Sequence, residues 1–310
     1  MMKNETFGLE ELEISELIRE LRLEKKIHQD VLYSGLCGRK VYFQLENGDC
    51  IMDELLSERL FSRLHVQYRW LDIMLSDENF WQKEQRHEIE LKIQKKCWVE
   101  AELLLKEYEE KAPKNKIHKQ YILAERAEIL FRTGQENVGD LFKEALELTM
   151  SVEELEKRLK GSKVIAENEL WMYVRYRDCE KPFSAEEYQV LLDNMEEMFL
   201  INHICPNVYF EVAYQYALAL WKNKEYGLCR KHCRNTIEWL REGRKSFHLA
   251  EFYFLDAMAG MKLEHDAAEE REFYQQCKMA CYVSVSFGEK ETAEKIQKYC
   301  GEEFKWHIIG

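Results

Sequence analysis

The chain has 310 residues, with 45 Lys and Arg against 58 Asp and Glu, so its formal net charge is −13. It contains only 3 Pro and 13 Gly, whereas average usage gives roughly 15 and 20 in a chain of this length. The acidic total argues against a protein that coats nucleic acid non-specifically. The scarcity of helix breakers, with 33% of the residues charged, predicts long helices.

No stretch reaches the ~18 consecutive apolar residues that a membrane helix needs. Residues 1–11 are acidic and lack the apolar core of a signal peptide. We therefore expect a cytoplasmic protein with no membrane partner, whose cysteines are reduced thiols. Cys229 and Cys233 are four residues apart, as are Cys277 and Cys281, which places each pair on one helix face. We expect buried thiols there, and no metal or cofactor.

The apolar residues recur at spacings of three and four, and alternating strand patterns with hairpin turns are nearly absent. The predicted fold class is all-α. The predicted helices, in chain order, are 11–25, 29–35, 39–46, 53–64, 66–76, 78–95, 97–111, 117–132, 136–149, 152–159, 162–179, 184–200, 207–222, 226–242, 246–262, 265–283 and 289–300. Pro113, Pro182 and Pro206 lie in the polar connectors between them. From about residue 66 onward the helices come in pairs, which predicts an α-solenoid.

Residues 14–66 carry the sharpest motif. The first part is basic, a glutamine opens the second predicted helix, and the third predicted helix ends in Leu45-Glu46-Asn47-Gly48. Residues 19–44 hold six basic and three acidic side chains. The segment resembles the Cro/phage-repressor (XRE-type) helix-turn-helix. The residues that match this family are Arg19, Arg22, Lys25, Lys26, Gln29 and the run 45–48.

The apolar residues of the same segment support a small core across three short helices. We expect that core to contain Leu17, Ile18, Leu21, Ile27, Val31, Leu32, Leu36, Val41 and Leu45, with Leu55, Leu56, Leu60, Phe61 and Leu64 covering it. Gly35, Gly38 and Gly48 are placed where the chain must turn.

In a helix-turn-helix the second motif helix lies in the major groove, and its N-terminal residues meet base edges. Here that helix is 39–46, with Arg39, Lys40, Tyr42, Phe43 and Gln44 expected outward. Arg39 and Lys40 suit guanine, Gln44 suits adenine or phosphate, and Tyr42 or Phe43 suits a thymine methyl. The resemblance also assigns phosphate contacts to Arg22, Lys25, Lys26 and Gln29.

Two departures from the family pattern predict weak intrinsic affinity. Asp49 follows the motif where a basic loop is common, and Gly38 stands where Ser or Thr would cap the recognition helix. Both favour double-stranded DNA binding by a homodimer, because two half-sites multiply the contacts.

Residues 214–240 resemble a tetratricopeptide repeat, with Ala217 as the small packing residue and Tyr226 at the turn into the second helix. Looser copies cover 121–148 and 252–281. A helical bundle without repeat ancestry is the alternative, and both arrangements predict a binding scaffold. No phosphate-binding loop, nucleophile elbow or zinc-protease motif occurs, so we expect no enzyme.

The two parts together resemble the peptide-responsive Rgg/PlcR-type regulators of Gram-positive bacteria. The resemblance implies a DNA-binding domain at 1–66 and a tetratricopeptide-like domain at 67–310. In that family the repeats dimerise and bind a short signalling peptide in a concave groove. By this resemblance the chain is a cytoplasmic transcriptional regulator involved in quorum sensing.

The predicted groove residues follow from taking Ala217 as the packing residue. They are Asn168, Trp171, Arg175, Glu211, Tyr214, Leu218, Trp221 and Tyr253. The aromatic members also fit an ordinary inter-repeat core. Two rival functions stay open: a regulator whose repeats only dimerise or bind another protein, and a repeat adaptor whose degenerate helix-turn-helix no longer binds DNA.

Overall fold

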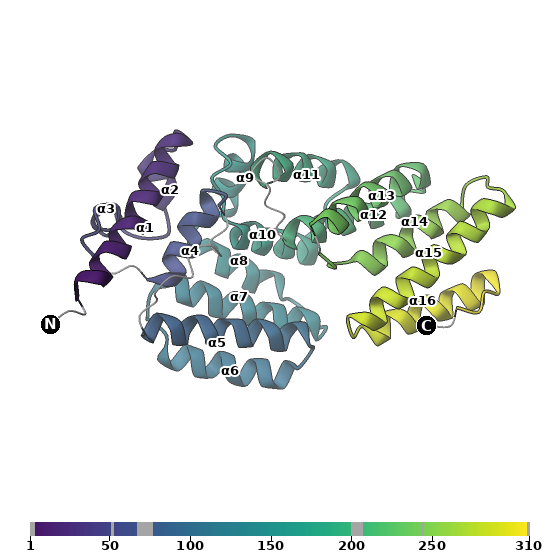
Figure 1. Cartoon of the computed structure of the whole chain (residues 1–310), viewed down its shortest axis with the longest axis horizontal. Coiled ribbons are helices and arrows are strands. Elements are labelled where there is room, and N and C mark those ends of the chain that lie inside the picture. Colours follow the sequence, from purple (N-terminus) through teal and green to yellow (C-terminus); the bar gives the residue numbers. More distant parts are fainter. Residues whose placement is uncertain (1–3, 51–52, 67–76, 200–206, 244, 309–310) are drawn as a thin grey trace. The chain divides into compact units, whose positions relative to one another are not determined.

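The structure is a computed structural model that describes residues 4–50, 53–66, 77–199, 207–243 and 245–308. Within these ranges every regular element is a helix, which confirms the predicted all-α class. The helices are α1 (Asn4–Glu24), α2 (Gln29–Tyr33), α3 (Arg39–Glu46), α4 (Glu54–Arg63), α5 (Asp77–Gln94), α6 (Trp98–Lys111), α7 (Lys116–Arg132), α8 (Gly139–Glu147), α9 (Val152–Lys160), α10 (Glu167–Glu180), α11 (Ala185–Phe199), α12 (Asn207–Lys222), α13 (Tyr226–Glu242), α14 (Leu249–Met261), α15 (Ala267–Ser286) and α16 (Lys290–Phe304) (Figure 1).

The predicted helix bounds are close to those observed, and α3, α12 and α13 agree residue for residue. The prediction for 66–76 falls almost wholly outside the described residues, as does Pro206. The helix predicted from 162 begins only at Glu167, because Ala166 is extended and forms the N-cap of α10. The helix predicted from 136 begins at Gly139, because Asn137 adopts a left-handed conformation with φ 59°.

The chain forms two compact units. Unit 1 comprises Met1–Pro182 and Met198–Ile204, and unit 2 comprises Phe183–Glu197 and Cys205–Gly310. The compact units therefore do not divide at residue 66, because the first four helices and the helices up to α10 pack as one body. The functional boundary at 66 stays a prediction.

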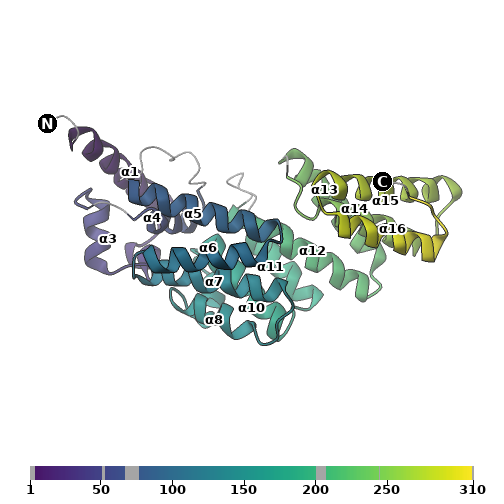
Figure 2. The same ribbon diagram turned by 90° about the horizontal axis from the view of Figure 1, so that it is seen from below.

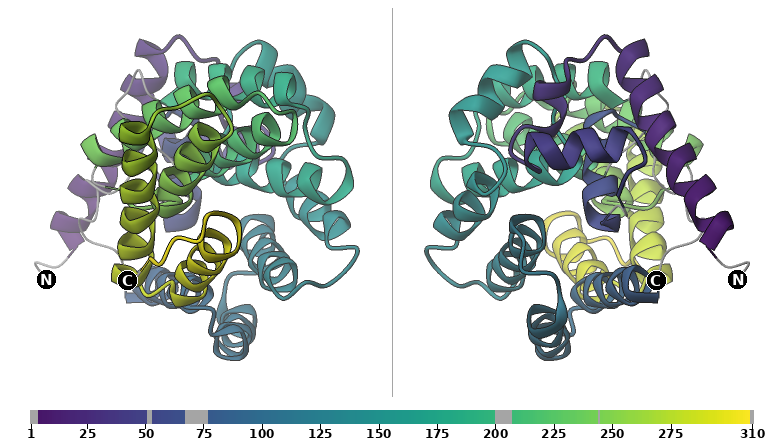
Figure 3. Two further views of the ribbon diagram at one scale, coloured as in Figure 1. Left: turned by 90° about the vertical axis from the view of Figure 1, so that its right-hand side faces the viewer. Right: turned by 90° about the vertical axis from the view of Figure 1, so that its left-hand side faces the viewer.

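Unit 1 begins with α1–α4, which we call the N-terminal module. Its core contains Ile18, Leu32, Leu36, Leu45, Leu55 and Phe61, all at most 2% exposed. Leu17, Leu21, Ile27 and Val31 pack against this core, as predicted. Val41 was expected there too, but it is 44% exposed, because it lies on the flank of α3. The right-hand view of Figure 3 shows α1 as a long purple helix beside the shorter helices of the module.

The later helices pack mainly on their neighbours in sequence. In unit 1, α6 lies against α5 and α7, and α8 lies against α7 and α10 (Figure 2). In unit 2, each of α13, α14 and α15 packs on the helix before it and the helix after it. Ala217 is fully buried in α12, as expected for a small packing residue. Cys229, Cys233, Cys277 and Cys281 are fully buried thiols, as predicted. None of the described helices is long and apolar enough to cross a membrane.

A tight turn of the N-terminal module rests against the helices that follow. Gly35, between α2 and α3, has a φ of 78°, and a Cβ atom there would lie 1.7 Å from the carbonyl oxygen of Thr149. Only glycine allows both the left-handed backbone and this close approach. Gly134 offers a matched comparison, because its φ is 76° but nothing lies within 4 Å of a Cβ atom there.

We therefore predict that Gly35→Ala destabilises unit 1 far more than Gly134→Ala. The left-handed backbone alone costs about 1–2 kcal/mol for alanine, and Gly134→Ala should lose only this amount. Gly35→Ala adds a steric overlap with backbone and should lose at least about twice as much. Thermal unfolding of the two variants measures the difference, and equal losses would contradict the close contact.

Candidate DNA-binding face and repeat sites

The α2–turn–α3 segment is built around α3, which has one buried side and one exposed side. Helix α2 begins after His28, whose ring accepts a hydrogen bond from the backbone N–H of Asp30, and Leu36 N–H donates to the Tyr33 carbonyl at 2.8 Å in the turn. Gly38 is the N-cap of α3 and provides no side-chain hydrogen bond, as the sequence predicted. Tyr42, Leu45 and Glu46 are buried, which fixes one side of α3 against the module.

The opposite side of α3 is open to solvent. Arg39, Lys40, Phe43 and Gln44 are all exposed. The Arg39 guanidinium lies over the Phe43 ring, 5.4 Å from its centroid, so the two side chains support each other. These four residues have the outward placement that the sequence predicted, while their contact with DNA stays a prediction. Lys25 is half-buried and Lys26 is exposed just beyond α1, and their phosphate contacts also stay predictions.

Two predicted DNA contacts, those of Tyr42 and Arg22, need correction, because these side chains are buried and bind Glu46 inside the module. Tyr42 is fully buried, and its hydroxyl donates to Glu46 Oε1 at 2.6 Å. Arg22 is only 8% exposed, with Nε 2.7 Å from the same oxygen. The Gln29 amide also donates to Glu46 Oε2, but Gln29 is only half-buried and its phosphate contact stays a prediction. Burial and the hydrogen bond to Glu46 raise the pKa of Tyr42 well above its usual value. These residues hold α1, α2 and α3 together.

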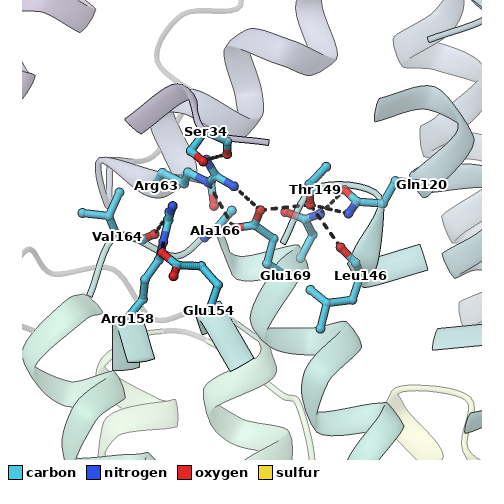
Figure 4. A network of polar contacts seen from close by, with 12 residues as sticks. Ser34, Arg63, Gln120, Leu146, Thr149, Glu154, Arg158, Val164, Ala166 and Glu169 are labelled. Carbon is cyan, nitrogen blue, oxygen red and sulfur yellow. Dashed lines mark hydrogen bonds and ion pairs between the residues drawn. The ribbon is translucent and has the colours of Figure 1, made fainter. Parts of the chain in front are cut away.

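A buried ion pair joins the N-terminal module to the rest of unit 1 (Figure 4). The Arg63 guanidinium, at the end of α4, forms a bidentate contact with Glu169 on α10, with N–O distances of 2.5 and 3.1 Å. Both side chains are fully buried. A further guanidinium nitrogen of Arg63 donates to the carbonyls of Leu32 and Ser34 at 2.7 Å each. Burial raises the pKa of Glu169, but Arg63 and the hydrogen bonds from Ala166 and Thr149 together outweigh that effect and lower the pKa overall.

A second arginine supports the same junction. Arg158, on α9, donates to the Val31 carbonyl at 3.2 Å and the Val164 carbonyl at 2.9 Å. Its Nε also bonds Glu154 at 2.9 Å. Neither Arg63 nor Arg158 was singled out from the sequence. The available clue was a charged residue inside an apolar run, as in Leu60-Phe61-Ser62-Arg63-Leu64.

The polar network continues from Glu169 to a predicted groove residue. Thr149 donates to Glu169 at 3.1 Å, and the Gln120 amide donates to Thr149 at 2.6 Å. Asn168 Nδ2 donates to Gln120 Oε1 at 3.1 Å. Among the described residues, the buried Oδ1 of Asn168 has no hydrogen-bond partner. Asn168 therefore offers an unused acceptor at one end of a network that reaches α2.

The other predicted groove residues of unit 1 are engaged in packing. Arg175 is 3% exposed and contacts Glu128 at 3.1 Å, so it is a buried structural residue and the groove prediction for it is wrong. Trp171 is half-buried and packs edge-on against Phe142, with ring centroids 5.6 Å apart.

In unit 2 two of the predicted groove residues, Glu211 and Tyr214, contact His248. Glu211 is 5% exposed and lies 3.2 Å from the His248 ring, which corrects its assignment to an open groove. Tyr214 is stacked on His248, with ring centroids 4.4 Å apart. Leu218 is half-buried. Trp221 and Tyr253 pack against the core of the unit. Among the described residues, no group of three or more His, Cys, Asp or Glu could hold a metal ion.

His248 gives unit 2 a specific pH dependence. Burial alone lowers the pKa of His248, but the Glu211 and Glu251 carboxylates outweigh it and raise the pKa to about 9, from 6.5. A raised pKa stabilises the fold below the unfolded value and loses that effect as the pH rises through the folded value. We predict that unit 2 loses up to about 3 kcal/mol between these two pH values. His248→Gln should flatten this profile in pH-resolved thermal unfolding, whereas His307→Gln, at an exposed position, should leave it unchanged.

Comparison with known proteins identifies the fold. No protein-family model and no curated protein matches the chain. PlcR from Bacillus thuringiensis, solved in complex with the peptide PapR7 and DNA, is a structural neighbour with 13% identity, a TM-score of 0.53 and coverage of 92% of this chain and 99% of that chain. The apo form of the competence regulator ComR from Streptococcus vestibularis has 12% identity, a TM-score of 0.49 and coverage of 95% and 99%. The predicted resemblance to the Rgg/PlcR type is thus confirmed at the level of the fold, which is that of PlcR.

Proposed function

We propose that this protein is a sequence-specific DNA-binding transcriptional regulator. The observation that carries the proposal is the two-sided α3, with Arg39, Lys40, Phe43 and Gln44 exposed and its other side fixed by Tyr42, Leu45 and Glu46. A basic and amide-bearing face on a rigidly supported short helix suits base edges in the major groove. Lys25 and Lys26 contact phosphates, and residues 1–66 act as the DNA-binding domain. The fold shared with PlcR, which was solved with DNA, supports the assignment.

Residues 67–310 act as a tetratricopeptide-like domain that dimerises and senses a short peptide. Support comes from Asn168, whose buried Oδ1 is without a partner among the described residues and suits a peptide N–H. PlcR was solved with the peptide PapR7. The uncapped start of α3 supports a homodimer, since two half-sites offset weak single contacts. The rival in which the repeats only dimerise is favoured by the burial of Arg175 and Glu211.

We predict that Arg39→Ala/Lys40→Ala strongly weakens sequence-specific binding to the DNA upstream of the protein's own gene. Each lost base contact costs about 1–3 kcal/mol, so affinity should fall about a hundredfold. A gel shift measures this fall. Lys95→Ala/Lys181→Ala is the charge-matched control, because both lysines are exposed and lie outside the N-terminal module. Equal binding by the two double variants would contradict the regulator assignment and favour a repeat adaptor.

We also predict that Asn168→Ala keeps DNA binding but loses the response to peptide. The probes are synthetic peptides encoded by small reading frames beside the gene, and the measurement is the change in DNA affinity on peptide addition. Trp171→Phe, on the same helix, should keep the response, because its packing against Phe142 is preserved. If Asn168→Ala responds like the wild type, the repeats do not sense the peptide through this residue.

A further inference from the structure

A lysine-rich corner lies between α6 and α7, outside the helix-turn-helix motif. Residues 111–119 contain four lysines and no acidic residue. Lys111 pairs with Glu107 at 2.7 Å, and Lys119 lies 4.0 Å from Glu144. Lys114 is exposed and donates only to the backbone carbonyls of Glu109 and Glu110. Neither Lys114 nor Lys116 has an ion-pair partner among the residues that the structure describes.

Lys116 occupies a position at which a helix disfavours a positive charge. Lys116 is the first residue of α7, and the first turn of this helix contains no acidic residue. The positive end of the helix dipole disfavours a cation there and favours an anion. Lys116 goes against this local preference of the helix, and no acidic residue in the first turn of α7 compensates for it. Such a position is typical of a functional residue.

The corner is held firmly against the N-terminal module. Asp53 is the N-cap of α4, accepting from Leu56 N–H at 3.1 Å. The same carboxylate lies 3.0 Å from His118 Nε2 and accepts from the Asn115 amide at 3.4 Å, so the first turns of α4 and α7 are tied together. His118 is fully buried, and its other ring nitrogen lies 2.7 Å from the Tyr108 hydroxyl. Lys116 at the start of α7 therefore keeps a fixed position relative to α4.

That position is beside the start of the recognition helix. Lys116 and Asn115 line the same pocket of about 350 Å³ as Cys37, Gly38 and Val41. Burial raises the pKa of the Cys37 thiol to about 11, and the nearby Lys116 ammonium opposes that shift. Gly38 is the N-cap of α3, and a Cβ atom there would meet nothing within 4 Å. A duplex whose bases are read by the N-terminal residues of α3 passes next to the pocket that Lys116 and Gly38 line.

We propose that the α6–α7 corner, through Lys114 and Lys116, contacts the phosphate backbone of the same DNA that α3 reads. This inference rests on the proposed function of α3 and extends the DNA-binding surface beyond residues 1–66. Lysine ammonium groups bind phosphate as mobile point charges and read no bases. The contact therefore adds affinity equally to every sequence and fixes the orientation of unit 1 on the duplex.

The test uses the full chain and two duplexes of equal length, one from the DNA upstream of its gene and one scrambled. Binding is followed by fluorescence anisotropy across a range of salt concentrations. Lys114→Ala/Lys116→Ala should weaken binding to both duplexes about tenfold and make the salt dependence shallower by about 1.8 in log–log slope, because each lost phosphate contact removes about 0.9. Lys114→Arg/Lys116→Arg should keep the wild-type affinity, because arginine retains the positive charge. Lys95→Ala/Lys181→Ala controls for net charge.

The outcomes separate this inference from the proposed function. If Arg39→Ala/Lys40→Ala loses the upstream duplex while Lys114→Ala/Lys116→Ala matches the control, α3 reads DNA and the backbone contact is overturned. A loss confined to the upstream duplex would also overturn it, since a backbone contact is blind to sequence. If the wild type binds neither duplex, both assignments fail together.

Discussion

The position of the candidate recognition helix depends on the fully buried ion pair between Arg63 and Glu169. Two charges removed from water are costly unless further hydrogen bonds satisfy them. Here the arginine also reaches the carbonyls of Leu32 and Ser34, while the glutamate accepts from Thr149 and from the Ala166 backbone N–H at 2.9 Å. Removing one partner of such a pair costs about 3–5 kcal/mol, because the other charge is left buried and unpaired. The end of α2 thus depends on a residue more than one hundred positions away.

Buried arginine–carboxylate pairs recur through unit 1 and explain which site predictions needed correction. Arg22 binds Glu46, Arg86 binds Glu54, and Arg175 binds Glu128. Two of these arginines had been assigned to ligand contacts. A sequence shows the charge of an arginine but not the carboxylate that a distant helix brings to it. The helical period predicted the outward Arg39, Lys40, Phe43 and Gln44 correctly, whereas Tyr42 faces inward because its hydroxyl has a buried acceptor in Glu46.

The helices themselves were predictable because the chain repeats apolar residues at helical spacing and confines Pro113 and Pro182 to connectors. The packing of the N-terminal module against α7–α10 was not predictable. It depends on Gly35 meeting Thr149, on Asp53 meeting His118 and on Arg158 reaching the Val31 carbonyl, all of which join residues far apart in sequence. The repeat-site predictions likewise mixed half-buried aromatics with buried charges, because a repeat pattern places residues on a helix but does not specify what packs opposite them.

The division of α3 into two sides has a consequence for how such a protein can change its target. Tyr42, Leu45 and Glu46 carry the structural role, while Arg39, Lys40, Phe43 and Gln44 are exposed. Exchanging Lys40 or Gln44 therefore alters the chemistry offered to a duplex while leaving the scaffold unaffected. Arg39 and Phe43 are the exception, because their stacking means that a change at one alters the orientation of the other. Under the proposed function, retargeting this fold to a new operator requires changes at a few surface side chains, two of which must be redesigned as a pair.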